Sequence, residues 1–189
     1  MQCCVLLRIN PVDPAQSNYL PNHNMDPEVV TGGSFGQIWH FTTPPSANGF
    51  PEEFIARSLV YTPSSTGRQV VISFSEQNKI YVLDAVNGTL YASRDLSLSG
   101  EPPFLVSDLG GCNDIPNVIG ITGTPVVDPT TDTVYFWAKS YLGSERGWQN
   151  GAYYFHGVDA ATLVERPGFP VNIQGQPCKS RVDCFFGRG

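Results

Sequence analysis

Few residues of this sequence have the type and spacing that catalysis requires. The segment GGSFG at 32–36 matches the G-x-S-x-G spacing of a nucleophile elbow, in which a serine lies between a strand and a helix. The residues that follow, QIWHFTT at 37–43, alternate as a β-strand does, so Ser34 fits a structural turn better than a nucleophile. No catalytic residue is predicted, because no serine or cysteine lies at a catalytic spacing from His23, His40 or His156.

One loop contains candidate metal ligands. Asp108, Asn113 and Asp114 offer oxygen atoms, which calcium prefers, although their spacing does not match an EF-hand. Loop aspartates also accept the N–H groups of their own turns, and this structural role is the alternative for Asp108 and Asp114.

Cysteines and tryptophans also allow two interpretations. The five cysteines contain no CxxC motif, but the last pair could form a disulfide in a secreted chain; they are Cys3, Cys4, Cys112, Cys178 and Cys184. Tryptophan rings can stack on a planar cofactor, but between β-sheets they more often pack in the core; they are Trp39, Trp137 and Trp148.

Composition favours an all-β fold that binds neither nucleic acid nor membrane. The 189 residues include 19 glycines and 16 prolines but only 15% charged residues, which indicates short strands joined by turns. A net charge of −6 without any Lys/Arg cluster lacks the electrostatic footprint of a nucleic-acid-binding protein. No apolar run approaches the roughly 18 residues of a membrane span. The segment MQCCVLLRIN at 1–10 does not resemble a signal peptide.

The segment 57–94 predicts a four-stranded antiparallel meander. Runs of β-branched and aromatic residues alternate there with turn residues, and each turn is short. Asn87-Gly88 predicts a type I′ hairpin turn between the last two strands. Asn87 also begins an N-glycosylation sequon, Asn87-Gly88-Thr89, which would place a glycan on this turn.

The same pattern recurs over about 120–173, so the chain contains an internal repeat. Strands in both units are apolar on both faces, as in IYVL at 80–83 and VYFW at 134–137, which predicts that both sheets are covered on both sides. Stacked blades of a β-propeller meet that requirement, whereas a two-layer sandwich leaves one face of each sheet in water.

Two stretches resemble a known family. NKIYVLDAVNGTLYAS at 78–93 resembles the repeat of quinoprotein (PQQ-repeat) β-propellers, in which a strand ending Leu-Asp-Ala leads through x-Thr-Gly into the next strand. The sequence at 108–141, followed by 157–175, is similar to a secreted fungal and bacterial family of such propellers, many of which have no assigned activity. Ala92 stands where the repeat has its docking tryptophan, and Leu163 stands at the turn glycine of the second unit.

The resemblance implies an all-β partial propeller of two four-stranded antiparallel blades and one extra strand. Residues 1–32 are expected to be an irregular extension and 176–189 an irregular tail, on either side of a propeller part at 33–175. That part divides into an extra strand (33–43), blades at about 57–94 and 120–173, and an inter-blade loop (97–119). So few blades imply a fragment or truncated product with open apolar faces that favour self-association.

Three functional hypotheses follow from the resemblance. The first is a propeller module without assigned activity that binds a carbohydrate or a protein. The second is the remnant of a quinone-dependent alcohol or sugar dehydrogenase that uses PQQ and calcium, and some quinoproteins of this kind carry a vicinal disulfide like Cys3-Cys4. The third is a product with no activity. The full-length family implies an extracellular location.

Overall fold

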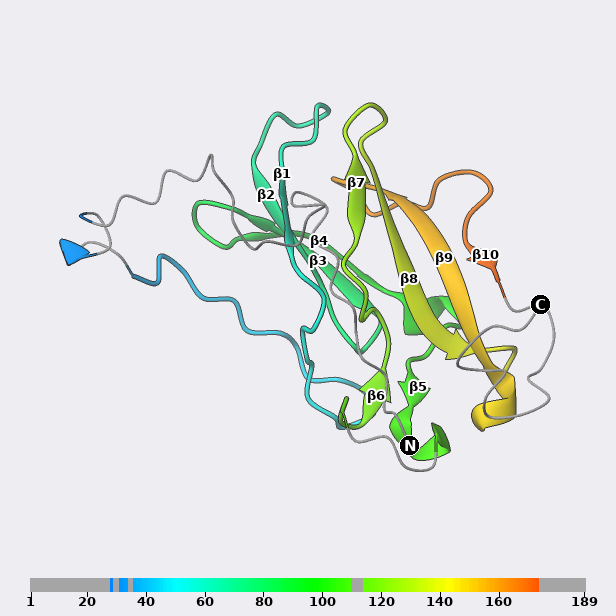
Figure 1. Ribbon diagram of the computed structural model, residues 1–189. Coiled ribbons are helices and arrows are strands. Elements are labelled where there is room, and N and C mark those ends of the chain that lie inside the picture. Colours follow the sequence, from blue (N-terminus) through cyan, green and yellow to red (C-terminus); the bar gives the residue numbers. More distant parts are fainter. Residues whose placement is uncertain (1–27, 29–30, 34–35, 110–113, 174–189) are drawn as a thin grey trace.

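The computed structural model describes residues 28, 31–33, 36–109 and 114–173. This part of the chain is all-β and consists of two four-stranded antiparallel sheets and one two-stranded sheet, none of them closed into a barrel (Figure 1). Among the described residues, no helix is long and apolar enough to cross a membrane.

Each predicted meander forms one four-stranded antiparallel sheet, so the all-β class expected from the sequence is confirmed. The first sheet has the order β1 (Leu59–Tyr61), β2 (Val70–Phe74), β3 (Lys79–Asp84), β4 (Leu90–Asp95). The second has the order β10 (Val171–Asn172), β9 (Gly151–Asp159), β8 (Thr133–Tyr141), β7 (Val126–Asp128). All neighbours are antiparallel and consecutive in sequence, as short turns require.

The connection between these sheets is more ordered than the loop expected at 97–119. It contains a two-stranded sheet of β5 (Phe104–Leu105) and β6 (Val118–Ile119) together with the 3-10 helices η1 (Leu96–Ser99) and η2 (Val106–Leu109). A further 3-10 helix, η3 (Trp148–Asn150), precedes β9.

The extra strand expected over 33–43 is not formed in the described part of that range, residues 33 and 36–43. Residues 37–46 pair with no strand of the described chain, and they cross the outer face of the first sheet instead of joining its edge. Side chains hold this segment: Trp39 Nε1 donates to the carbonyl oxygen of Ala85 at 3.0 Å, and the Phe41 ring lies 5.5 Å from that of Tyr81. The alternation of apolar and polar residues therefore gives an extended segment here, but the segment does not pair with a neighbouring strand of the described chain.

The β3–β4 turn differs from the predicted type I′ hairpin. Of the Asn87-Gly88 pair, only Gly88 has a positive φ, at 73°. One carboxylate oxygen of Asp84 accepts the N–H groups of Val86 at 2.8 Å and Asn87 at 2.9 Å, which stabilises a longer turn that Gly88 closes by donating to the carbonyl of Asp84 at 2.9 Å.

The turn that follows β9 repeats this arrangement. Asp159 accepts the N–H groups of Ala161 and Thr162 at 3.0 and 2.8 Å, and Leu163 donates to the carbonyl of Asp159 at 2.9 Å. Leu163 replaces the glycine and adopts the same left-handed conformation, with φ 59°. An L-residue is strained there, but its side chain is buried in the core, which compensates.

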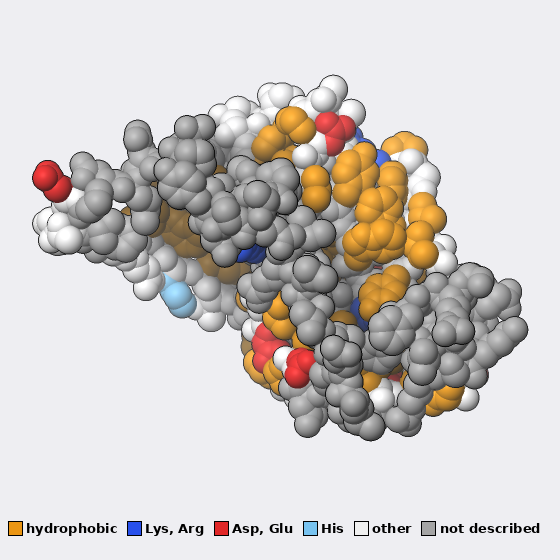
Figure 2. All heavy atoms as spheres, viewed as in Figure 1, with side chains coloured by type: hydrophobic (Ala, Val, Ile, Leu, Met, Phe, Trp, Pro, Cys, Tyr) orange, Lys and Arg blue, Asp and Glu red, His pale blue; other side chains and the backbone are white. Residues whose placement is uncertain are grey.

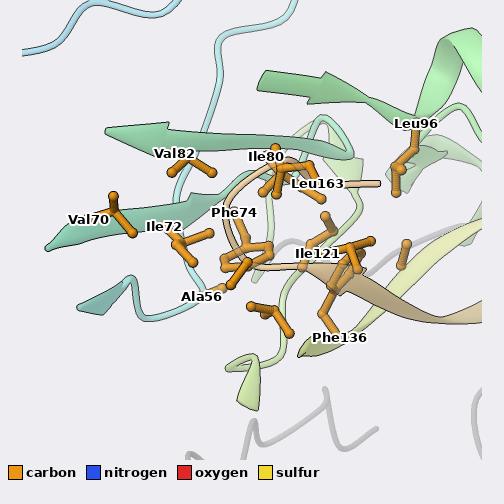
Figure 3. Packing of buried hydrophobic residues seen from close by; sticks show 14 residues of the cluster. Ala56, Val70, Ile72, Phe74, Ile80, Val82, Leu96, Ile121, Phe136 and Leu163 are labelled. Carbon is orange, nitrogen blue, oxygen red and sulfur yellow. The ribbon is translucent and has the colours of Figure 1, made fainter. Parts of the chain in front are cut away.

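One hydrophobic core joins the two sheets. In β2, Val70, Ile72 and Phe74 alternate toward it, and the Phe74 ring lies 5.3 Å from that of Phe136 in β8. Figure 3 shows side chains of both sheets meeting in this layer, together with those of the connecting segments. The cluster consists of Ala56, Val70, Ile72, Phe74, Ile80, Val82, Leu96, Ile121, Val134, Phe136, Ala138, Val158, Ala160 and Leu163.

The two outer faces differ. The covered face is the outer side of the first sheet, made by Val71, Ser73, Tyr81 and Leu83, and the segment 37–58 lies over it. The open face is the outer side of the second sheet, and Figure 2 shows hydrophobic side chains gathered there. It consists of Val126, Tyr135, Trp137, Phe155, Phe169, Val171 and Ile173.

Candidate functional site

A groove of about 370 Å³ lies between the covered face and the segment that crosses it. Aromatic rings and small polar side chains form its walls. The described residues that line it are Gln37, Trp39, His40, Phe41, Thr43, Phe54, Ser58, Val71, Ser73, Tyr81 and Leu83.

The β3–β4 turn fixes one end of the groove. The indole ring of Trp39 lies directly on Gly88, where an added Cβ atom would be 2.7 Å from the ring. Glycine is therefore required at position 88 for two reasons, the positive φ and the closeness of this ring. The hydrogen bond from Trp39 to Ala85 completes the anchor.

Tyr81 fixes the floor of the groove. Its hydroxyl donates to the Glu52 carboxylate, with both oxygens at 2.8 Å, and Glu52 also forms an ion pair with Lys79 at 2.8 Å. Burial and the Glu52 carboxylate raise the pKa of Tyr81 far above its ordinary value, so the phenol is neutral. The rings of Phe41 and Phe54 lie 5.5 and 6.2 Å from that of Tyr81, on the groove side.

The lining of the groove is neutral. None of the described lining residues is Asp, Glu, Lys or Arg, although the chain has a net charge of −6. The polar groups are hydroxyl, amide and imidazole groups, and two of them, Ser58 and Ser73, form a hydrogen bond of 2.9 Å. Aromatic faces together with neutral donors and acceptors match a ligand with an apolar side and many hydroxyl groups.

A second polar cluster joins the sheets. His156 of β9 is fully buried; its Nε2 lies 2.9 Å from Glu101, and its Nδ1 lies 3.3 Å from Glu165. Arg94 of β4 forms an ion pair with Glu165 at 2.6 Å and donates to the carbonyl of Leu163 at 3.0 Å. The cluster therefore connects β4 of the first sheet to β9 and the turn that follows it in the second.

Charge compensation explains how this cluster is tolerated inside the fold. Burial by itself lowers the pKa of His156, but the hydrogen bonds and charges of Glu101 and Glu165 outweigh it and raise the pKa. Burial alone raises the pKa of Glu165, but His156 and Arg94 lower it overall. When the imidazole is protonated it donates from both nitrogens, and together with Arg94 it then supplies two cations to this acidic cluster. Both ring nitrogens of His156 contact carboxylates of the cluster, so we interpret its role as structural: it helps to hold the two sheets together.

The β2–β3 turn is a second buried polar element at the same junction. Glu76 accepts hydrogen bonds from Gly120 N and Thr122 Oγ1, both at 2.8 Å, while its Oε1 has no hydrogen-bond partner among the described residues. Burial raises the pKa of Glu76 to about 6, against the lowering effect of these two hydrogen bonds. The amide nitrogen of Asn78 donates to the carbonyls of Glu101 and Lys139 at 3.0 Å each.

A third contact ties the opposite ends of the sheets. Asp132, in the β7–β8 turn, accepts hydrogen bonds from the Tyr61 hydroxyl at 2.5 Å and from Ser64 N and Oγ at 2.9 and 2.5 Å. The hydrogen bonds from Ser64 and Tyr61 lower the pKa of Asp132 to about 2, so it is ionised at neutral pH.

The three calcium candidates have different surroundings. Asp108 accepts hydrogen bonds from the Tyr141 hydroxyl at 2.7 Å and from Gly147 N at 2.9 Å, which is a structural role between loops. Asp114 is exposed, and Asn113 lies outside the described residues. Within the described ranges, no group of three or more His, Cys, Asp or Glu side chains could hold a metal ion.

The remaining sequence-predicted residues are dispersed. Asn87 is exposed in the β3–β4 turn, where its side chain accepts the N–H of Thr89 at 2.9 Å. His40 and Trp39 line the groove, Trp137 lies on the open face, and Trp148 is in η3. Ser34, His23 and all the cysteines lie outside the described residues.

Sequence reasoning missed the groove and the buried polar junction. The clearest available signal was His156, which alternates with the core residue Val158 on one side of β9. A histidine in a core position needs polar partners, so acidic residues elsewhere had to reach it. The partners themselves, Glu101 and Glu165, have no local signature.

Comparison with known proteins yields no match: no family model, curated protein or solved structure matches this chain.

Proposed function

We propose that this chain is a carbohydrate-binding module and that the groove on the first sheet binds a neutral saccharide. The observation that carries the proposal is the combination of aromatic rings with a lining that, over the described residues, contains no Asp, Glu, Lys or Arg. A sugar ring has an apolar face that stacks on aromatic side chains, and its hydroxyl groups pair with neutral donors and acceptors. An ionic ligand would instead require a compensating charge in the lining.

In this proposal the two four-stranded sheets are propeller blades of the PQQ-repeat type, and the groove lies on the first of them. Two observations support the assignment of the sheets as blades. The turns after β3 and β9 share one hydrogen-bond pattern around Asp84 and Asp159, and each ends in a residue with a left-handed φ. The two sheets also pack face to face through one core, as neighbouring blades do.

Isothermal titration with neutral oligosaccharides of defined linkage tests the proposal. We expect saturable binding by the complete chain and a loss of about 5- to 10-fold in affinity for Phe54→Ala, because truncating an aromatic contact costs about 1 kcal/mol. Phe54 is 44% exposed in the groove, so its truncation leaves the core intact. Leu98→Ala is the control, since Leu98 is exposed in η1 and does not line the groove.

Any of three results contradicts the proposal. The first is the absence of binding across linear and branched neutral saccharides at millimolar concentrations. The second is binding that Phe54→Ala and Leu98→Ala weaken equally, because the saccharide would then be bound elsewhere. The third is a preference for an acidic saccharide.

A further inference from the structure

A second cavity, of about 360 Å³, lies between the two sheets at one end of their shared core. Val70 of β2 and Val82 of β3 form its floor, and Figure 3 shows both at the end of the core away from Leu96. Ala161, in the turn that follows β9, adds a wall from the second sheet. The cavity shares no described lining residue with the groove, and strand alternation places the two on opposite sides of the first sheet.

The rim of this cavity is polar and exposed to solvent. Thr66 and Arg68, in the β1–β2 turn, line it together with Tyr91 of β4. The Arg68 guanidinium lies over the Tyr91 ring, 5.6 Å from the ring centroid. This cation–π contact positions the side chain and leaves N–H donors of the guanidinium available to a further partner. The cavity therefore combines an apolar floor with a cationic edge.

The charge of Arg68 is not used by an ion pair within the described chain, because none of the ion pairs there involves it. Asp84, at the end of β3, is the carboxylate beside the cavity. One of its oxygens accepts the N–H groups of Val86 and Asn87, and the other accepts the Tyr91 hydroxyl. These hydrogen bonds, that of Tyr91 above all, lower the pKa of Asp84, and the charge of Arg68 adds to the effect. The Asp84 carboxylate thus serves its own turn and Tyr91, and Arg68 can bind a second anion.

We propose that this cavity binds a small organic monocarboxylate with an apolar body. The Arg68 guanidinium pairs with the carboxylate, for which its planar set of donors is suited. The apolar body lies against Val70, Val82 and Ala161, where it leaves water. A dianionic phosphate fits less well, because Arg68 is the only cation among the described lining residues and Asp84 would repel the second charge.

The size of the cavity limits the ligand and its affinity. Sites for small molecules measure roughly 300 to 1,000 Å³, so this cavity belongs to the smallest of them. A ligand of roughly ten to fifteen non-hydrogen atoms is expected, and for that size a Kd on the order of 1 mM. Phenylpropionate has this size, one carboxylate and an apolar body, and phenylpropionamide has nearly the same shape without the charge.

Titration of the complete chain with phenylpropionate, followed by amide NMR, tests the proposal. We expect saturable shifts of the amide signals of 66–70 and 160–163, which surround the cavity. Phenylpropionamide should bind at least about 5-fold more weakly, because it cannot form the charged pair. Phe54→Ala should leave these shifts unchanged, so this test and that of the saccharide groove can fail separately.

Two variants locate the site. Arg68→Gln should weaken binding about 10-fold, and the fold should persist because Arg68 is exposed. Ala161→Leu should weaken it at least as much, because the larger side chain fills the cavity while Arg68 is retained. The control is Arg57→Gln, which removes the same charge from an exposed residue that does not line the cavity and should bind as the unmodified chain does.

Four results would overturn the proposal. They are the absence of shifts up to about 10 mM phenylpropionate, equal binding of the amide, equal weakening by Arg68→Gln and Arg57→Gln, and shifts confined to residues of the groove. Tighter binding of phenyl phosphate than of phenylpropionate would overturn the choice of a monocarboxylate.

Discussion

The two sheets share one core and one kind of turn, but their outer faces have different surroundings. On the first sheet, Tyr81 is 3% exposed because the preceding segment crosses over it and holds it through Glu52 and Phe41. On the second sheet, the corresponding apolar side contains Trp137 at 43% exposure. A repeated sequence pattern therefore produces repeated strands, while the cover of each sheet depends on what the rest of the chain places there.

The largest expected difference between the faces is in stability. Tyr81→Ala should lower the free energy of unfolding by about 3 to 5 kcal/mol, because it removes a buried ring and releases the contacts of Glu52, Phe41 and Phe54. Trp137→Ala should cost only about 1 kcal/mol, because its ring is already partly in water. Urea unfolding of both variants at low protein concentration measures the difference. Equal losses would mean that the two faces are covered to the same extent.

A smaller effect is expected at the junction between the sheets, where pH changes stability. The folded-state pKa of Glu76 is raised from 4.5 to about 6, so the folded chain holds this proton more tightly than the unfolded chain does. Stability should therefore fall as pH rises from about 4.5 through 6, by about 2 kcal/mol. The raised pKa of His156 acts in the same direction: its contribution is present below 6.5 and is lost as pH rises through the folded value.

Thermal melts between pH 3 and 8 check this dependence. Glu76→Gln should be more stable than the unmodified chain at pH 8 and should show a flatter profile, because the amide carries no charge to bury. Glu145→Gln is the matched control, since Glu145 is exposed. Below pH 4.5 the lowered pKa of Glu165 should reverse the trend, because its contribution is lost as this carboxylate is protonated. If Glu76→Gln left the dependence of stability on pH unchanged, Glu76 would not be the group responsible for it.

The smallest expected effect compares the two turns. Gly88→Ala should cost about 1 to 2 kcal/mol and should also weaken saccharide binding, because the added methyl group pushes against Trp39 and strains a positive φ. Leu163→Gly should cost about 1 to 2 kcal/mol without affecting the groove: it relieves about 1 kcal/mol of strain but removes a buried side chain. Chemical unfolding and titration of both variants test this. If Gly88→Ala bound the saccharide as tightly as the unmodified chain, the β3–β4 turn would not be needed to shape the groove.

Local pattern made the two meanders predictable and left the turn type uncertain. Strands such as β3 and β8 combine β-branched and aromatic residues with flanking turn residues, and that signal acts within a few positions. The type I′ prediction at Asn87-Gly88 was wrong because the Asp84 carboxylate stabilises a longer turn. The strand predicted over 33–43 was wrong because alternation does not supply a neighbouring edge to pair with.

The sequence by itself determined the two antiparallel sheets, because these depend on side-chain periodicity and on turn residues between neighbouring strands. Only the tertiary structure decided which face is covered, where the neutral groove lies and which partners His156 meets. Those features arise from contacts such as Tyr81 with Glu52 and His156 with Glu101, which join residues far apart in the chain. The free-energy cost of each polar group depends on how deeply it is buried, and the local sequence pattern does not reveal that burial.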